Sequence, residues 1–128
     1  MFRCLLPLAL LVLVGCAGSG PDLVGSWRLV ESGPGRPPAE EAVKILNDTH
    51  FAFGSDQSGG VFAGGGLWRL EGETYLEEVQ WHSRGDLVGE TIRFGCRVVD
   101  GRWHHTADFE VNDRRYHIEE IWERIDID

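Results

Sequence analysis

The chain has 128 residues and a formal net charge of −9 at pH 7, with 21 Asp and Glu against 12 Lys and Arg. A surface with this charge repels phosphate backbones, so the composition argues against nucleic-acid binding. The length suits one domain with a single hydrophobic core.

Residues 1–15 have the composition of an export signal. Arg3 supplies a positive start, and residues 5–14 form an apolar run that is too short to cross a bilayer comfortably. The run ends in Leu13-Val14-Gly15-Cys16, which resembles a bacterial lipobox. We therefore predict that residues 1–15 are removed and that Cys16 becomes a lipidated N-terminus, whose two or more acyl chains give a stable membrane anchor. An ordinary cleaved signal and an uncleaved anchor are the alternatives.

The predicted anchor places the protein in the cell envelope. Ala17 after the lipidated cysteine is compatible with the outer membrane, on its periplasmic face, and a monoderm surface stays open as an alternative. Residues 16–22 are predicted to form a flexible tether, and residues 23–126 form the domain.

The cysteines allow no internal disulfide. Cys4 leaves with the predicted signal and Cys16 is predicted to be acylated, so Cys96 stands alone. Because Cys96 alternates with apolar residues, we interpret it as a small buried hydrophobe rather than a reactive thiol.

From residue 23 onward, apolar and polar residues alternate with a period of two, which is typical of β-strands. Pairs such as Asp100-Gly101 and Asn112-Asp113 separate the alternating stretches and favour antiparallel hairpins. The predicted strands are residues 23–31, 43–46, 50–54, 61–70, 74–81, 90–99, 102–111 and 116–124.

Eight consecutive strands predict an all-β fold in up-and-down order. An open sheet of this size leaves two unpaired edges, and closure into a barrel removes them. Eight strands also give a barrel that just holds side chains or one small ligand. We therefore predict an eight-stranded antiparallel up-and-down barrel rather than a sandwich. The glycine-rich residues 55–66 are predicted to be either a mobile flap or a sharply bent strand start.

Motifs at both ends of the domain resemble the calycin superfamily, which includes lipocalins and fatty-acid-binding proteins. Gly25-Ser26-Trp27 matches its short Gly-x-Trp motif, and Arg124 matches the arginine that packs over this tryptophan. The segments that more closely resemble the small bacterial lipocalin-like domains, which are often exported, are 23–29, 44–51, 64–68 and 118–124.

This resemblance implies that Trp27 and Arg124 close the barrel. In a closed meander the first and last strands are neighbours, so the guanidinium can stack on the indole and seal one end. The Arg-x-Tyr carboxylate clamp of the superfamily is absent, because Ile125 and Asp126 follow Arg124.

Taking Trp27 as inward and following the alternation assigns one face of the later strands to the interior. This face is aromatic but also carries carboxylates and a histidine, which need partners when buried. One interpretation is a satisfied network, with Glu120 near Arg69 or Arg124, or His105 near Glu77. The other is a cavity whose polar groups orient a ligand. The predicted ligand-binding residues are Tyr75, Glu77, Trp81, Trp103, His105, Tyr116, Glu120 and Trp122.

The predicted interior has two carboxylates and no inward lysine, which does not favour a free fatty acid. A neutral, amphiphilic or cationic ligand fits this polarity better. Two hypotheses follow. The first is a membrane-anchored lipocalin-like protein that binds a small amphiphilic or hydrophobic ligand inside the barrel. The second is an envelope protein-interaction module with a filled barrel, such as an assembly factor or an inhibitor of a basic enzyme like lysozyme. A void of a few hundred Å³ would favour the first.

Catalysis and metal binding are not predicted. The sequence lacks a nucleophile elbow, a phosphate loop, a Cys-x-x-Cys pair and a His-Glu-x-x-His helix, and it indicates no cofactor. Glu77 and Glu120 as an acid–base pair is a minority interpretation. So is a zinc site that combines His105 with His50 or His82 and a carboxylate.

Overall fold

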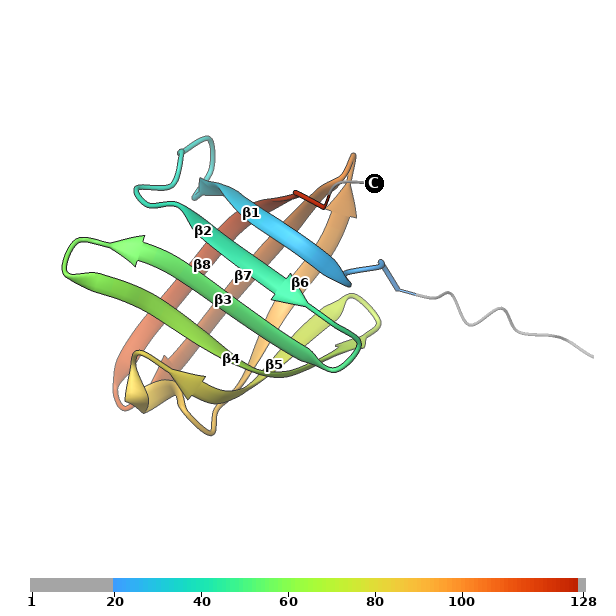
Figure 1. Cartoon of the computed structure of the whole chain (residues 1–128). Helices are drawn as coiled ribbons and strands as arrows, with labels where there is room; N and C mark the ends of the chain where they lie inside the picture. Colours follow the sequence, from blue (N-terminus) through green and yellow to red (C-terminus); the bar gives the residue numbers. More distant parts are fainter. Residues whose placement is uncertain (1–19, 127–128) are drawn as a thin grey trace, which may run out of the picture.

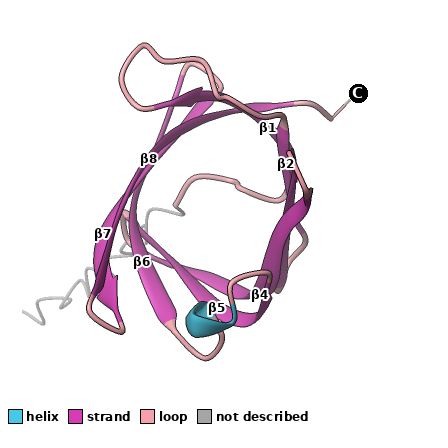
Figure 2. Ribbon diagram, turned by 90° about the vertical axis from the view of Figure 1, so that its left-hand side faces the viewer, coloured by secondary structure: helices cyan, strands magenta, loops and turns pink. Residues whose placement is uncertain are grey.

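The computed structural model describes residues 20–126, which form a closed barrel of eight strands. Each strand pairs antiparallel with the next, and the last returns to pair with the first (Figures 1 and 2). The predicted all-β, up-and-down barrel is confirmed. The predicted signal, Cys16 and most of the tether lie outside the described residues. The strands are β1 (Gly25–Ser32), β2 (Ala42–Leu46), β3 (His50–Gln57), β4 (Gly60–Glu71), β5 (Thr74–His82), β6 (Thr91–Val99), β7 (Arg102–Val111) and β8 (Arg114–Arg124).

A single 3-10 turn, η1 (Gly85–Leu87), lies in the connection between β5 and β6 and is the only helical element in the described part of the chain. Residues 20–126 contain no helix that is long and apolar enough to cross a membrane.

The turn residues have the backbone conformations that tight hairpins require. Asp100 and Gly101 have φ values of 52° and 74°, and Asn112 and Asp113 have φ values of 50° and 62°. Positive φ at both central positions is the signature of the type I′ turn, whose twist matches that of the flanking strands. The antiparallel pairing of β6 with β7 and of β7 with β8 therefore follows from local sequence.

The prediction of a flap or sharp bend over residues 55–66 is wrong. β3 and β4 are paired continuously from His50 with Leu67 to Gln57 with Gly60, around a two-residue turn. The glycines of β4 instead give room to neighbouring aromatic side chains. A Cβ atom on Gly64 would collide with the rings of His82 and Phe53.

The prediction that Trp81 points inward is also wrong. The pairing of β4 with β5 shifts between Gly65 and Gly66, which face Trp81 and Val79 respectively, so Gln80 is an extra residue in β5. Such a bulge reverses the alternation beyond it. Trp81 therefore lies on the outside, 49% exposed and packed against Gly65, and His82 turns to the interior instead.

The hydrophobic core fills one end of the barrel, which we call the closed end. The indole of Trp27 packs edge-to-face on that of Trp103 at 5.3 Å, and Tyr75 packs on Trp103 at 5.1 Å. Trp27 Nε1 donates a hydrogen bond of 2.9 Å to the carbonyl of Leu23, so the indole is both packed and satisfied.

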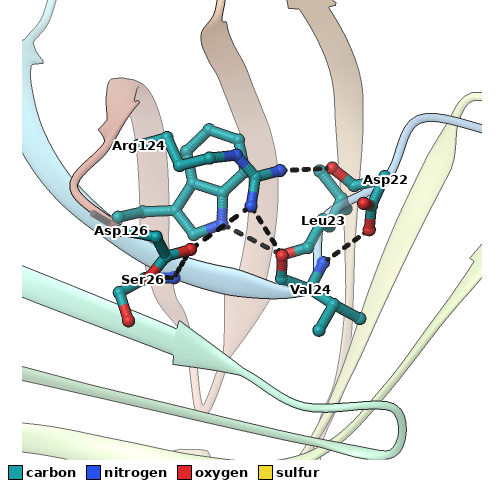
Figure 3. Close-up of polar contacts among 7 residues, drawn as sticks. Asp22, Leu23, Val24, Ser26, Arg124 and Asp126 are labelled. Carbon is teal, nitrogen blue, oxygen red and sulfur yellow. Dashed lines mark hydrogen bonds and ion pairs between the residues drawn. The ribbon is translucent and has the colours of Figure 1, made fainter. Parts of the chain in front are cut away.

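Arg124 covers the outer side of this core. Its guanidinium lies 4.3 Å from the Trp27 ring centre, within cation–π range. The same guanidinium donates to the carbonyls of Val24 at 2.6 Å and Asp22 at 2.8 Å (Figure 3). Trp27 and Arg124 are also register partners across β1 and β8. The pair therefore joins the two ends of the domain by stacking, hydrogen bonds and strand pairing together.

We expect Trp27→Ala to lower the free energy of unfolding by about 3–5 kcal/mol, because it removes a large, fully buried side chain from the closed end. Urea unfolding followed by circular dichroism measures this loss. A loss below about 1 kcal/mol would contradict the role given to this indole.

Candidate functional site

A cavity of about 370 Å³ occupies the barrel between the closed end and the opposite end, which we call the mouth. The mouth is bordered by the β1–β2 loop at Pro38–Glu40 and by Arg84 and Leu87 of the β5–β6 connection. Below it, the walls are largely apolar. The wall residues include Phe53, Phe62, Ile92, Phe94, Phe109 and Ile118.

Four polar side chains gather at the inner end of the cavity, and we call them the polar floor: Lys44, Glu77, His105 and Glu120. They come from β2, β5, β7 and β8, so strands from opposite sides of the barrel meet there. Lys44, Glu77 and His105 are all buried. The burial of charged groups is costly unless they are paired, so each contact of the floor bears on what the cavity can hold.

Lys44 and Glu77 form a buried ion pair. Lys44 Nζ lies 2.8 Å from Glu77 Oε1, and the Tyr75 hydroxyl donates to the same oxygen at 3.0 Å. The ammonium also lies 5.2–5.9 Å from six aromatic ring centres, which add cation–π attraction. The six rings are those of Phe51, Phe53, Tyr75, Phe94, Trp103 and Trp122.

The expectation of an interior without lysine is therefore wrong. Strand β2 reads Ala-Val-Lys-Ile-Leu, in which Val43 and Ile45 form an apolar outer face and Ala42 and Leu46 flank Lys44 on the inner face. Either face could have been assigned to the core from composition alone. The pairing of Lys44 with Trp27 across β1 and β2 places it on the inner side.

Glu120 is bonded within its own strand. Trp122 Nε1 donates to Glu120 Oε2 at 2.9 Å. Burial raises the pKa of Glu120 above its ordinary value, while the nearby Lys44 charge and the Trp122 hydrogen bond oppose the shift. The predicted partners are wrong: Arg69 bonds to Glu71 at the surface, and Arg124 is engaged at the closed end.

His105 is a buried, neutral imidazole. It is 1% exposed, and its ring stacks on that of Phe94 with a centroid separation of 3.8 Å. Burial lowers the pKa of His105 well below its ordinary value, and the Lys44 charge lowers it further. Within residues 20–126, no group forms a hydrogen bond with its Nδ1 atom. The predicted bond to Glu77 is absent from the described contacts, because Glu77 Oε1 is bonded to Lys44 and Tyr75.

The predicted ligand-binding residues divide into three groups. Those that line the cavity are Glu77, His105, Tyr116, Glu120 and Trp122. Tyr75 and Trp103 instead pack in the closed-end core beneath the floor, and Trp81 lies outside. The main residues that sequence reasoning missed are Lys44, His82, Arg84, Phe53 and Phe62. The two phenylalanines alternate inward on β3 and β4, so period-two parity could have found them.

The mouth carries its own polar contacts. The Tyr116 hydroxyl donates to Asp86 Oδ2 at 3.0 Å, and the Arg84 guanidinium lies 5.1 Å from the Tyr116 ring centre. His82 Nδ1 accepts a bond of 2.8 Å from the Arg84 amide, and burial lowers the pKa of this imidazole. The mouth is therefore polar where it meets water, while the walls below it are apolar.

The possible metal ligands and the one thiol of the described residues are arranged as follows. In residues 20–126, no group of three His, Cys, Asp or Glu side chains has the geometry to hold a metal ion. Cys96 is buried, and burial raises the pKa of its thiol, which disfavours the reactive thiolate. What the arrangement can do is enclose a small molecule and contact its polar group.

Comparison with known proteins identifies no family for this chain. No protein-family model matches the chain, and no curated protein matches it in sequence. Among solved structures, the "REP1-NXSQ fatty acid transporter" is similar, with 14% sequence identity and a TM-score of 0.43. The similarity covers 83% of this chain and 98% of that one. These values are too low to place the two proteins in one family.

We expect Lys44→Met and Glu77→Gln each to destabilise the protein by about 3–5 kcal/mol, because each leaves the other partner buried without its counter-charge. The double variant should lose clearly less than the sum of the two, because it removes both charges. A double-mutant cycle on urea unfolding measures the coupling.

The surface pair Arg115–Glu110 is a matched control. Its Nε and Oε2 atoms lie 3.4 Å apart at well-exposed positions. Its coupling energy should stay below about 1 kcal/mol. Equal coupling in the two cycles would contradict the assignment of Lys44 and Glu77 as a pair shielded from solvent.

Proposed function

We propose that this chain is a lipocalin-like protein that binds one small amphiphilic or hydrophobic ligand inside its barrel. The observation that carries the proposal is the cavity of about 370 Å³, whose walls are largely apolar. This volume lies in the range of small-molecule sites, which typically combine apolar walls with a few placed polar groups. The motif resemblance to lipocalin-like domains supports the same function.

The unfilled interior favours ligand binding over the alternative of a filled barrel that acts through its surface. Phe53, Phe62 and Phe109 border the space rather than closing it, although they are large enough to pack across a small barrel. The proposal is for binding without catalysis, because the sequence carries no catalytic motif and Glu77 is engaged by Lys44 and Tyr75.

We expect wild-type protein to bind the neutral fluorescent probe N-phenyl-1-naphthylamine with one site per barrel. Ala42→Phe should weaken this binding at least about tenfold, because Ala42 lines the cavity and the new ring would fill it. Fluorescence titration measures both.

Ala52→Phe is the matched control, since Ala52 lies on the neighbouring strand with its side chain on the opposite, outer face. This variant should bind within about twofold of wild type. Absence of probe uptake by the wild type, or equal affinities for all three proteins, would refute an internal site.

We further propose that the protein is a lipoprotein of the cell envelope, anchored by acylation of Cys16. The lipobox-like sequence Leu13-Val14-Gly15-Cys16 supports this proposal. In a bacterial host, Cys16→Ser should abolish incorporation of radiolabelled palmitate and shift the protein from the detergent phase to the aqueous phase. Cys4→Ser is the control and should change neither. Palmitate labelling that survives in Cys16→Ser would exclude this anchor.

A further inference from the structure

We infer that the polar floor selects ligands whose polar group is a protonated amine and rejects carboxylates. This inference rests on the proposed function, because it concerns the ligand of the same cavity. It follows from four features of the floor: a lysine that is already paired, a carboxylate with spare acceptor sites, a neutral histidine beside it, and the resulting charge.

Lys44 is already paired with an acid. Its ammonium is paired with Glu77 Oε1 at 2.8 Å and lies among aromatic rings. A ligand carboxylate that bonded to Lys44 would have to share this ammonium with Glu77, and two carboxylates would then lie close together in a buried site. The one cation of the floor is therefore already neutralised.

Glu120 keeps acceptor capacity toward the cavity. A carboxylate offers about four lone-pair sites, and the Trp122 indole donates to Oε2 alone among the contacts of the described residues. Glu120 lines the cavity, so a donor group of a ligand can approach it from that side. Trp122 and Phe94 also border the cavity.

His105 lies beside Glu120. His105 and Glu120 are directly opposite each other across β7 and β8, and side chains in such pairs have Cβ atoms about 4.5–5.5 Å apart. The imidazole is neutral and does not repel a cation, and its Nδ1 is buried and lacks a partner within residues 20–126. An ammonium group bound at Glu120 would therefore lie beside an uncharged ring.

The net charge of the floor also favours an amine over a carboxylate. Lys44 and Glu77 cancel, His105 is neutral, and Glu120 contributes the remaining charge when it is ionised. A bound ammonium would neutralise that charge in a site of low dielectric constant. A bound carboxylate would add a second negative charge close to Glu120, and like charges in such a site repel strongly.

The test compares three probes with the same alkyl chain: octylamine, octan-1-ol and octanoate. Isothermal titration calorimetry at pH 7 should show octylamine binding at least about tenfold tighter than octanoate, with octan-1-ol between them. Glu120→Gln should weaken octylamine binding at least about tenfold and leave octan-1-ol within about threefold of wild type. Glu119→Gln removes the same charge from the neighbouring position on β8, outside the cavity, and should leave all three affinities unchanged.

The outcomes separate the inference from the proposed function. If all three probes bind wild type with equal affinity, or octanoate binds most tightly, the amine preference is wrong while internal ligand binding stands. If none of the probes binds, both fail. The wild-type ranking decides the question even if Glu120→Gln does not fold, which thermal unfolding by circular dichroism would show.

Discussion

The pairing of the first strand with the last is the constraint on which the rest of this molecule depends. Without it, β1 and β8 would be open edges, and the cavity would lack the wall that carries Glu120 and Trp122. Arg124 reinforces the junction by stacking on Trp27 and bonding to the carbonyls of Val24 and Asp22. Trp27 in turn packs on Trp103, which supports the floor from below. Barrel closure and cavity shape are therefore set by one continuous set of contacts.

The floor is polar in a position where apolar side chains would often be equally stable or more stable. Replacing a buried ion pair by hydrophobic side chains is often neutral or stabilising, so the Lys44–Glu77 pair is weak evidence for stability. Its position at the inner end of an apolar cavity instead suits a role in orienting a bound molecule. It places charge and hydrogen-bonding groups where one end of a bound molecule would lie, and the apolar walls would contact the remainder.

Much of the barrel could be predicted because its signals are local. Turn pairs such as Asn112-Asp113 and the period-two alternation define the strands, and parity correctly places Glu77, His105 and Glu120 inside. The wrong predictions concern side chains whose inward or outward orientation depends on contacts with other strands. Trp81 leaves the interior because an extra residue in β5 reverses the alternation, and this bulge depends on the glycines of the neighbouring strand. Lys44 was missed because both faces of β2 carry apolar residues. Only the pairing of β2 with β1 shows that Lys44 lies on the inner face.

The chain enters the barrel at its closed end. Gly20 lies beside Leu70 and the carbonyl of Gly72, and β1 begins at the same closed end, opposite the mouth. A barrel held to a bilayer through the proposed lipid on residue 16 would be attached beside its closed end, and its mouth would lie at the end of the barrel farther from the attachment point. The length of the tether would then set how closely the mouth can approach the lipid.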